Sequence, residues 1–117
     1  MSVAISSKRY AEAVFQIANE KNELDEWLID LKKIARLMED EQFAFIIQNP
    51  VIPFQLKAEL TEGKLGKVNP ILLNFTFLLI HKNKFKNANQ IAQEYEHLLD
   101  EFILWESKVI KKQLIYI

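Results

Sequence analysis

The sequence has few residues that interrupt helices and none that form disulfides. Its 117 residues include 2 glycines, 3 prolines and no cysteine. So few helix breakers favour long helices over an architecture of short strands and turns. The lack of cysteine excludes a disulfide framework and thiolate chemistry, and it is consistent with a reducing compartment.

The chain also lacks a charge excess and a long apolar run. Its formal net charge is −1, which leaves no basic surplus to neutralise phosphates, so we expect no nucleic-acid partner. The most apolar stretch, 71–80, is far shorter than the ~20 residues needed to span a bilayer. The segment after Lys8 and Arg9 is amphipathic, unlike a signal peptide. We therefore expect a soluble, cytoplasmic protein without direct membrane insertion.

Apolar and helix-forming residues are abundant. Half of the residues are apolar, and Leu, Ile, Lys, Glu and Ala are the most frequent residues. This length and composition fit one domain with a substantial core. The spacing of apolar residues predicts an all-α protein, a six-helix bundle in a single domain.

Cap and breaker residues set the limits of the six predicted helices. The first begins at Ala4 or Ser7, with Ser6 or Ser7 as its N-cap, and ends at Glu20 before Asn22. The others run from Leu24 to Met38, from a cap at Asp40 to before Pro50, from Pro53 to Gly63 or Gly66, from Asn69 to Lys82, and from Asn87 past Asp100.

The last stretch of the sequence allows two interpretations. Residues 108–117 have a strand-like composition but no partner strand. They either extend the sixth helix or form the stub of a connection to a second domain. We therefore assign the helical bundle to residues 1–104 and a C-terminal tail to residues 105–117.

The first helix is apolar over more of its surface than one core requires. Seven residues cover an arc of about 200°, roughly twice the width of a single apolar stripe. They are Tyr10, Ala11, Ala13, Val14, Phe15, Ile17 and Ala18. We interpret this helix as having two partners, namely its own domain and a second helix from elsewhere.

The fifth helix shows a similar apolar excess. Little of its circumference is polar between Ile71 and Ile80. It is either a central helix buried on all sides by its own bundle, or the second wall of a groove shared with the first helix. The presence of two such helices favours the groove.

Signatures of catalysis are scarce. The sequence has no phosphate-binding glycine loop and no nucleophile elbow. Glu94 and His97 have the spacing of a metal-binding pair, but a di-iron bundle needs two such pairs and further glutamates. Adjacent acidic residues, as in Asp25-Glu26, diverge by about 100° on a helix and cannot converge on a substrate. We predict a protein that is not an enzyme, with no catalytic residue, no metal and no cofactor.

Several short motifs, in order along residues 3–101, resemble the delta subunit of F-type ATP synthase, whose mitochondrial counterpart is the oligomycin-sensitivity-conferring protein. The motifs are Arg9-Tyr10-Ala11-x-Ala13-Val14-Phe15, Trp27 with Leu31, Asn49-Pro50 followed by Lys57, Asn74-Phe75-x-x-Leu78-Leu79-Ile80, and Asn83-Lys84-Phe85. Each motif alone is weak, whereas their order and spacing are specific. At Lys84 and Phe85 the family usually has Arg and Leu.

The resemblance implies a stator component that links the catalytic head of the synthase to its peripheral stalk. In this family the domain binds the N-terminal helix of an alpha subunit in a groove made by the first and fifth helices. A second, C-terminal domain engages the stalk b subunit, so stalk binding is expected only where that domain is present. The implied location is the cytoplasmic face of the bacterial inner membrane, held there through the complex.

Carried over position by position, the resemblance predicts the residues that line the groove. They are Tyr10, Ala13, Val14 and Ile17 from the first helix and Asn74, Phe77, Leu78 and His81 from the fifth. An RNA-binding helical bundle of the antitermination-factor kind is the alternative. It would need a clustered basic face, whereas the lysines here are scattered among acidic residues.

Overall fold

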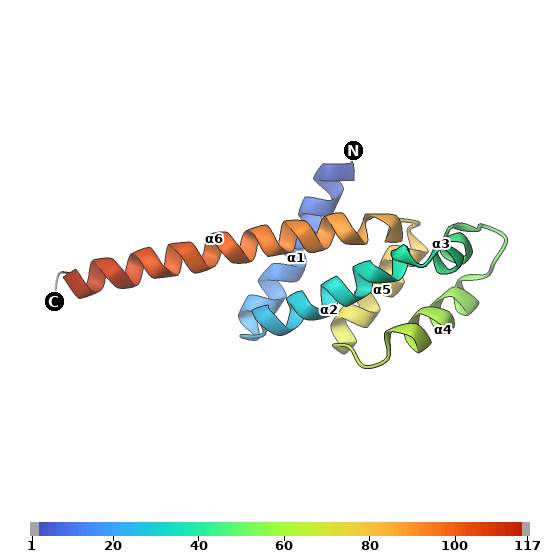
Figure 1. Cartoon of the computed structure of the whole chain (residues 1–117), viewed down its shortest axis with the longest axis horizontal. Helices are drawn as coiled ribbons and strands as arrows, with labels where there is room; N and C mark the ends of the chain where they lie inside the picture. Colours follow the sequence, from blue (N-terminus) through green and yellow to red (C-terminus); the bar gives the residue numbers. More distant parts are fainter. Residues whose placement is uncertain (1–2, 116–117) are drawn as a thin grey trace.

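The protein is an all-helical bundle from which one helix extends (Figure 1). The computed structural model describes the backbone of residues 3–115 and the side chains of residues 6–113. The helices are α1 (Val3–Glu20), α2 (Leu24–Arg36), α3 (Glu41–Gln48), α4 (Phe54–Leu65), α5 (Pro70–His81) and α6 (Ala88–Ile115), with short 3₁₀ turns at Leu37–Glu39 and Phe85–Asn87. Residues 3–115 contain no strand, so the predicted fold class is confirmed.

The core is built mainly by α6 packing across α1 and α2. Its largest fully buried side chains include Trp27 of α2, Phe43 of α3 and Tyr95 of α6. The hydroxyl of Tyr95 donates a hydrogen bond of 2.7 Å to the carbonyl oxygen of Leu24, which ties α6 to the first turn of α2. The expected core position of Trp27 is therefore confirmed.

Most of the predicted helix limits are confirmed by local chemistry. Asp40 accepts hydrogen bonds from the backbone N–H groups of Gln42 and Phe43 and so caps α3. The Lys64 ammonium group, 2.9 Å from the Asp40 carboxylate, together with these bonds, lowers the pKa of Asp40. Asn69 caps α5, where Pro70 occupies the first turn. The positive φ angle of 64° at Gly66 ends α4, because glycine adopts this conformation without a steric penalty.

The predicted N-cap of the first helix was wrong. Helix α1 already includes Val3, so Ser6 and Ser7 lie within it, and both are buried. The hydroxyl of Ser6 lies 3.1 Å from Nζ of Lys84, which follows α5. Packing against the rest of the bundle has outweighed the local preference of serine for a cap position. Helix α2 also ends earlier than predicted, at Arg36, and Met38 lies in a 3₁₀ turn.

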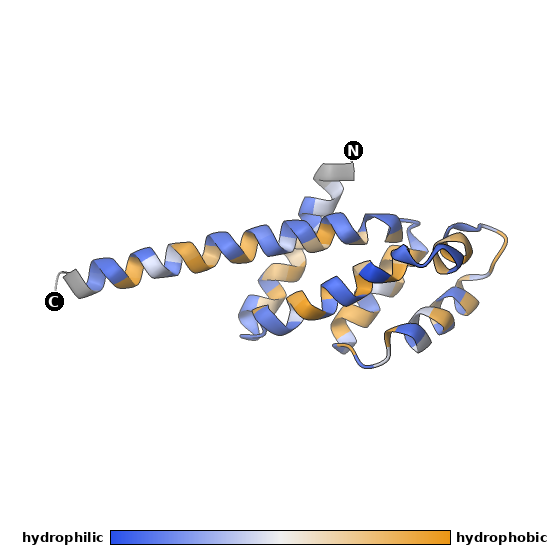
Figure 2. Ribbon diagram, in the orientation of Figure 1, coloured by the Kyte–Doolittle hydropathy of each residue, from blue (hydrophilic) through white to orange (hydrophobic). Residues whose placement is uncertain are grey.

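The predicted tail continues α6 as a helix. Figure 2 shows apolar residues, coloured orange, along this projecting end. The molecule measures 64 × 31 × 21 Å along its principal axes, because the second half of α6 extends past the bundle. The helical conformation reaches Ile115, which excludes a strand over residues 108–115. Residues 116 and 117 lie outside the described part, and the boundary at residue 104 remains a prediction.

Candidate functional site: a surface between α1 and α5

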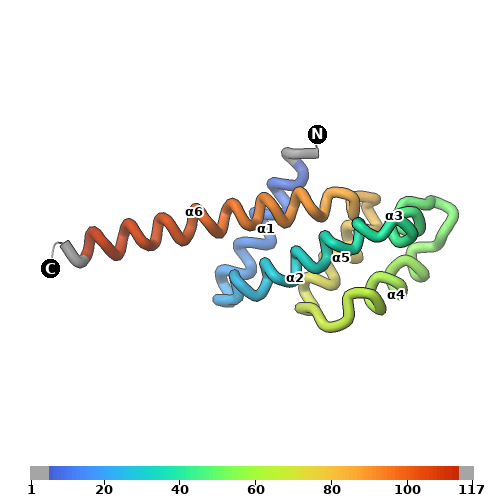
Figure 3. The backbone as a smooth tube through the Cα atoms, in the orientation of Figure 1, coloured from blue at the N-terminus to red at the C-terminus, as the bar shows by residue number. Residues whose placement is uncertain are grey.

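The candidate site is formed where α1 and α5 meet. The rings of Tyr10 on α1 and Phe75 on α5 have centroids 5.7 Å apart and are tilted by 60°. Near the start of α1, Nζ of Lys84 lies 5.6 Å from the centre of the Tyr10 ring and donates a hydrogen bond to the Ser6 hydroxyl. Ser6 in the first turn of α1 thus lies near Lys84, just beyond the end of α5, whereas Tyr10, one turn further along α1, contacts Phe75 in the middle of α5. The two helices therefore run in opposite directions. Figure 3 traces both helices behind α2 and α6.

The apolar excess of α1 is divided between two edges. On one edge, Phe15 packs edge-on against Tyr95 and Phe102 of α6, with ring centroids 5.5 and 5.9 Å away. On the other edge, half-buried Tyr10 is followed by exposed Ala13 and by Ile17, which is 37% exposed. The prediction that the bundle does not bury the whole apolar arc of α1 is confirmed.

The fifth helix is not buried on all sides. Leu72, Thr76, Leu79 and Ile80 face the core, whereas Ile71, Asn74, Leu78 and His81 are exposed. Ile71 is 37% exposed and Leu78 is 40% exposed. Both lie next to Phe75 on the helix surface, since positions three or four apart are neighbours. The interpretation of α5 as a fully buried central helix was therefore wrong.

These residues form what we call the α1/α5 surface. It consists of Tyr10, Ala13 and Ile17 on α1 and of Ile71, Asn74, Phe75 and Leu78 on α5. Five of the eight predicted site residues belong to this surface, and their role in binding stays a prediction. The surface is largely apolar, with one amide side chain, Asn74, that can donate and accept hydrogen bonds.

The other three predicted residues lie differently. Val14 is buried in the core, so little of its side chain is available to a partner. Phe77 is half-buried and packs against the core. His81 packs edge-on against Phe54 of α4, with ring centroids 5.6 Å apart, which places it at the α4 border of the surface.

Sequence reasoning missed two members of the α1/α5 surface, Ile71 and Phe75. Ile71 precedes Asn74 and Leu78 by three and seven positions, so helical spacing alone places it on their face. Phe75 contacts Tyr10 directly. The apolar excess of α5 contained both residues, but the sequence did not show which of them faced α1.

Among residues 6–113, no cluster of three His, Asp or Glu side chains could hold a metal ion. A hollow of about 340 Å³ between α2 and α6 contains the ion pair of Lys32 and Glu96, whose charges are 2.6 Å apart and neutralise each other. None of the helices that the structure describes combines the length and apolar character that crossing a membrane requires.

Comparison with known proteins identifies a family that this chain resembles. The family model described as ATP synthase delta (OSCP) subunit matches residues 7–103. ATP synthase subunit delta of Chloroherpeton thalassium is 35% identical over 102 residues, which cover 86% of this chain and 56% of that protein. The subunit of Dehalococcoides mccartyi is 32% identical over 93 residues, covering 80% of this chain and 51% of the relative.

A third relative, ATP synthase subunit delta of Clostridium beijerinckii, is 34% identical over 93 residues, which cover 78% of this chain and 52% of the relative. The chain therefore spans about half the length of the curated relatives that it matches. The family match includes all the residues of the α1/α5 surface and most of the bundle. On this evidence, the chain belongs to the ATP synthase delta (OSCP) subunit family.

Proposed function

We propose that the α1/α5 surface binds the N-terminal helix of an alpha subunit of F-type ATP synthase. The observation that carries this proposal is the paired exposure of apolar side chains on α1 and α5, on either side of the Tyr10–Phe75 contact. Two antiparallel helices with apolar facing edges suit a third, amphipathic helix, which lays its apolar face between them.

The side chains of the α1/α5 surface would contribute to recognition in different ways. Ile17, Ile71 and Leu78 supply apolar area, which is worth roughly 25 cal/mol per Å² removed from water. Ala13 is small and lets the backbone of the partner helix approach closely. Asn74 is the one polar side chain among the α5 residues of this surface, so it would fix the register of the partner helix through hydrogen bonds.

In the complex, this binding would serve a mechanical purpose. The chain would be a non-catalytic stator component that holds the catalytic head of the synthase against rotor torque. Attachment to the peripheral-stalk b subunit would be the role of a second, C-terminal domain, and the chain spans about half the length of the curated relatives that it matches. As a subunit of such a complex, the chain would lie at the cytoplasmic face of the bacterial inner membrane, held there through the complex.

The proposal is tested by placing a charge in the α1/α5 surface. Ala13→Asp puts a carboxylate where the partner helix would bury it unpaired, which costs several kcal/mol. We expect calorimetry to detect no binding of a peptide with the N-terminal segment of the alpha subunit, while circular dichroism shows an intact fold. Unchanged affinity would contradict the assignment of the surface.

A matched control is available on the same helix. Asn19→Asp adds the same charge to an exposed position of α1 that lies away from the Tyr10–Ala13–Ile17 edge. We expect this variant to bind the peptide like the unchanged protein. Equal losses in both variants would indicate a general charge effect and would also count against the assignment.

A further inference from the structure

A hollow of about 320 Å³ lies between the first turns of α4 and the C-terminal end of α5, and we call it the α4/α5 hollow. Its polar lining consists of a lysine, a histidine and two amides, and its apolar lining includes an aromatic ring and an aliphatic side chain. These residues are Lys57, His81, Gln48, Asn83, Phe54 and Ile80. No residue of the lining is acidic. The hollow therefore combines hydrogen-bond donors with a positive charge and contains no carboxylate to accept from them.

Lys57 supplies the permanent charge of the α4/α5 hollow. Its side chain is half-buried, and the ion pairs found among residues 6–113 all involve other side chains. Lys64, two turns further along α4, differs in this respect, because its ammonium group lies 2.9 Å from the carboxylate of Asp40. Partial burial reduces screening by water, so a nearby anion would be attracted to Lys57 more strongly than to a fully exposed lysine.

The turn after α5 places a further donor in the hollow. The backbone N–H of Asn83 donates a hydrogen bond of 3.0 Å to the carbonyl oxygen of Ile80, and Asn83 has a positive φ angle of 57°. Glycine is the usual residue in this conformation after a helix, and asparagine also tolerates it. Asparagine thus ends α5 as glycine would, and it adds a side-chain amide to the lining of the hollow.

A second turn of the same kind shows that the conformation alone does not select a ligand. Asn22 follows α1 with a φ angle of 56°, and it also lines a hollow. That hollow contains three acidic residues, Asp25, Glu26 and Glu106, and no basic one. The two hollows have similar turns and opposite charge, so only the one beside α5 suits an anion.

The chemistry of the α4/α5 hollow fits a carboxylate better than a phosphate. It has one permanent cation, and the last carbonyl groups of α5 carry partial negative charge, which disfavours an anion with two charges. Phosphate sites typically add several backbone N–H groups of a helix N-terminus or a cluster of arginines. A carboxylate can accept from Lys57 and from the amides of Gln48 and Asn83, while the methylene groups that carry it pack against Phe54.

We propose that the α4/α5 hollow binds a carboxylate side chain of the helix that occupies the α1/α5 surface. This proposal rests on the proposed function. His81 connects the two places, because it packs against Phe54 of the hollow and follows Leu78 of the α1/α5 surface by three positions, one helical turn. The hollow adjoins only the end of the surface at which α5 ends. An acidic residue bound there would therefore fix the direction in which the partner helix lies.

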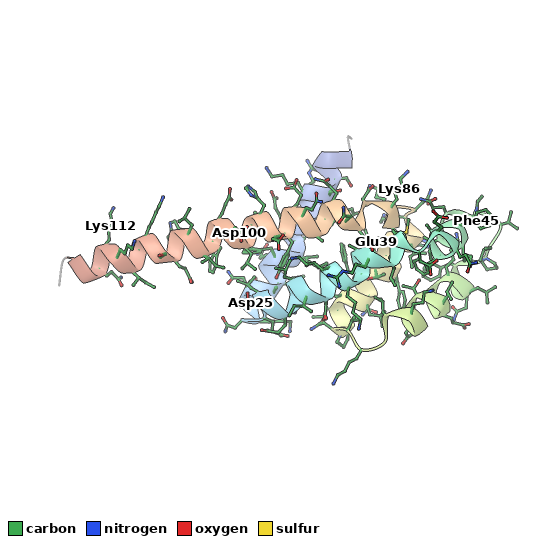
Figure 4. All side chains as sticks on the ribbon, in the orientation of Figure 1. Asp25, Glu39, Phe45, Lys86, Asp100 and Lys112 are labelled. Carbon is green, nitrogen blue, oxygen red and sulfur yellow. The ribbon has the colours of Figure 1, made fainter. Side chains whose placement is uncertain are left out.

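Sodium acetate tests the chemistry of the hollow without the peptide. In NMR spectra recorded at constant ionic strength, acetate in place of chloride should cause saturable shifts of the side-chain amides of Gln48 and Asn83. We expect a dissociation constant on the order of 10–50 mM. Lys57→Met should abolish the shifts. Lys86→Met is the matched control, because it removes the same charge from an exposed side chain outside the hollow, just before α6 (Figure 4).

The outcome of this titration decides the nature of the hollow. An absence of saturable shifts overturns the proposal, and so do shifts that persist in Lys57→Met or that disappear equally in Lys86→Met. Inorganic phosphate is titrated in parallel. If phosphate binds more tightly than acetate, the assignment to a carboxylate is wrong.

The alpha-subunit peptide tests the occupant of the hollow. Each acidic residue of the peptide is replaced in turn by its amide, and affinity for the unchanged protein and for Lys57→Met is measured by calorimetry. One replacement and Lys57→Met should each weaken binding about three- to tenfold, and the two together should weaken it no further. Lys57→Arg keeps the charge and should bind nearly as well as the unchanged protein. Circular dichroism checks the fold of each variant.

The proposal and the proposed function fail in different ways. If Ala13→Asp abolishes peptide binding while Lys57→Met shows no coupling to any acidic residue of the peptide, the hollow is not part of the site and the proposed function stands. If acetate binds in the hollow but the peptide does not bind the unchanged protein, the proposed function and the occupant named here are both wrong.

Discussion

The α1/α5 surface and the end of α6, residues 100–113, which we call the α6 extension, both present apolar side chains to solvent, but the bundle supports them differently. The residues of the α1/α5 surface lie beside packed aromatic rings, and its exposed aliphatic side chains are only 37–40% exposed. In the α6 extension, Phe102 packs against Phe15 of α1, whereas four apolar side chains beyond it, Ile103, Leu104, Trp105 and Ile110, are 53–62% exposed.

The side chains of the α1/α5 surface are therefore held by their neighbours, whereas those at the end of α6 have few neighbours. Side chains already held by neighbours lose little conformational freedom when a partner binds, so more of the gain from burial appears as affinity. Side chains with few neighbours lose more rotamer freedom when a partner binds, and this loss costs conformational entropy. The α1/α5 surface should therefore act as a rigid platform for a partner helix.

The largest expected effect compares the two halves of α6. Ile91 is buried in the first half, and Ile91→Ala should reduce the free energy of unfolding by roughly 2–5 kcal/mol. The same substitution at exposed Ile110 should cost less than about 0.5 kcal/mol. Urea unfolding of the two variants measures both. Equal losses would show that the extension is part of the folded core.

A smaller effect concerns Tyr95, near the end of the packed half of α6. Tyr95→Phe removes the hydrogen bond to the Leu24 carbonyl and should cost roughly 1 kcal/mol. Burial, with a contribution from the nearby carboxylates of Asp25 and Glu26, raises the pKa of Tyr95 above its usual range.

The direction of this shift predicts a pH dependence. A raised pKa means that the fold favours the neutral phenol, so its contribution to stability is complete below about pH 10, the ordinary tyrosine value. That contribution is lost as the pH rises further, and the loss should be smaller in Tyr95→Phe. Urea unfolding at several alkaline pH values measures it, and identical profiles for the two proteins would contradict the prediction.

An effect on stability similar in size to that of Tyr95→Phe compares the two aromatic edges of α1. Phe75→Leu removes the ring contact with Tyr10, and Phe15→Leu removes the contacts with Tyr95 and Phe102. Each should cost about 0.5–1.5 kcal/mol. Only Phe75→Leu should also weaken binding of the alpha-subunit peptide, several-fold by calorimetry. Weakening by Phe15→Leu to the same degree would remove the distinction between the two edges.

Much of the fold was predictable because its signals are local. The side chains of Asp40 and Asn69 accept hydrogen bonds from backbone N–H groups two or three residues further on and so begin α3 and α5, and Gly66 ends α4. These limits were predicted correctly. The apolar arcs of the helices gave the fold class. Ser6 and Ser7 show where this reasoning failed, since their burial depends on residues far along the chain, such as Lys84.

The candidate site was predictable only in part. Helical spacing placed Ala13 with Ile17 and Asn74 with Leu78, because neighbours on a helix follow from its geometry. It did not show that Phe15 faces α6 while Tyr10 faces α5, since both belong to the same apolar arc. That choice follows from the angle at which α1 crosses its two neighbours.

The sequence by itself determined that the chain is helical, where most of its helices end, and that α1 and α5 carry more apolar surface than one core can bury. These properties follow from hydrogen bonds and side-chain spacing within single helices. Only the tertiary structure decided which part of that apolar surface stays exposed, that Val14 lies in the core, and that α6 extends past the other helices. Burial depends on contacts between distant segments, and no local pattern specifies them.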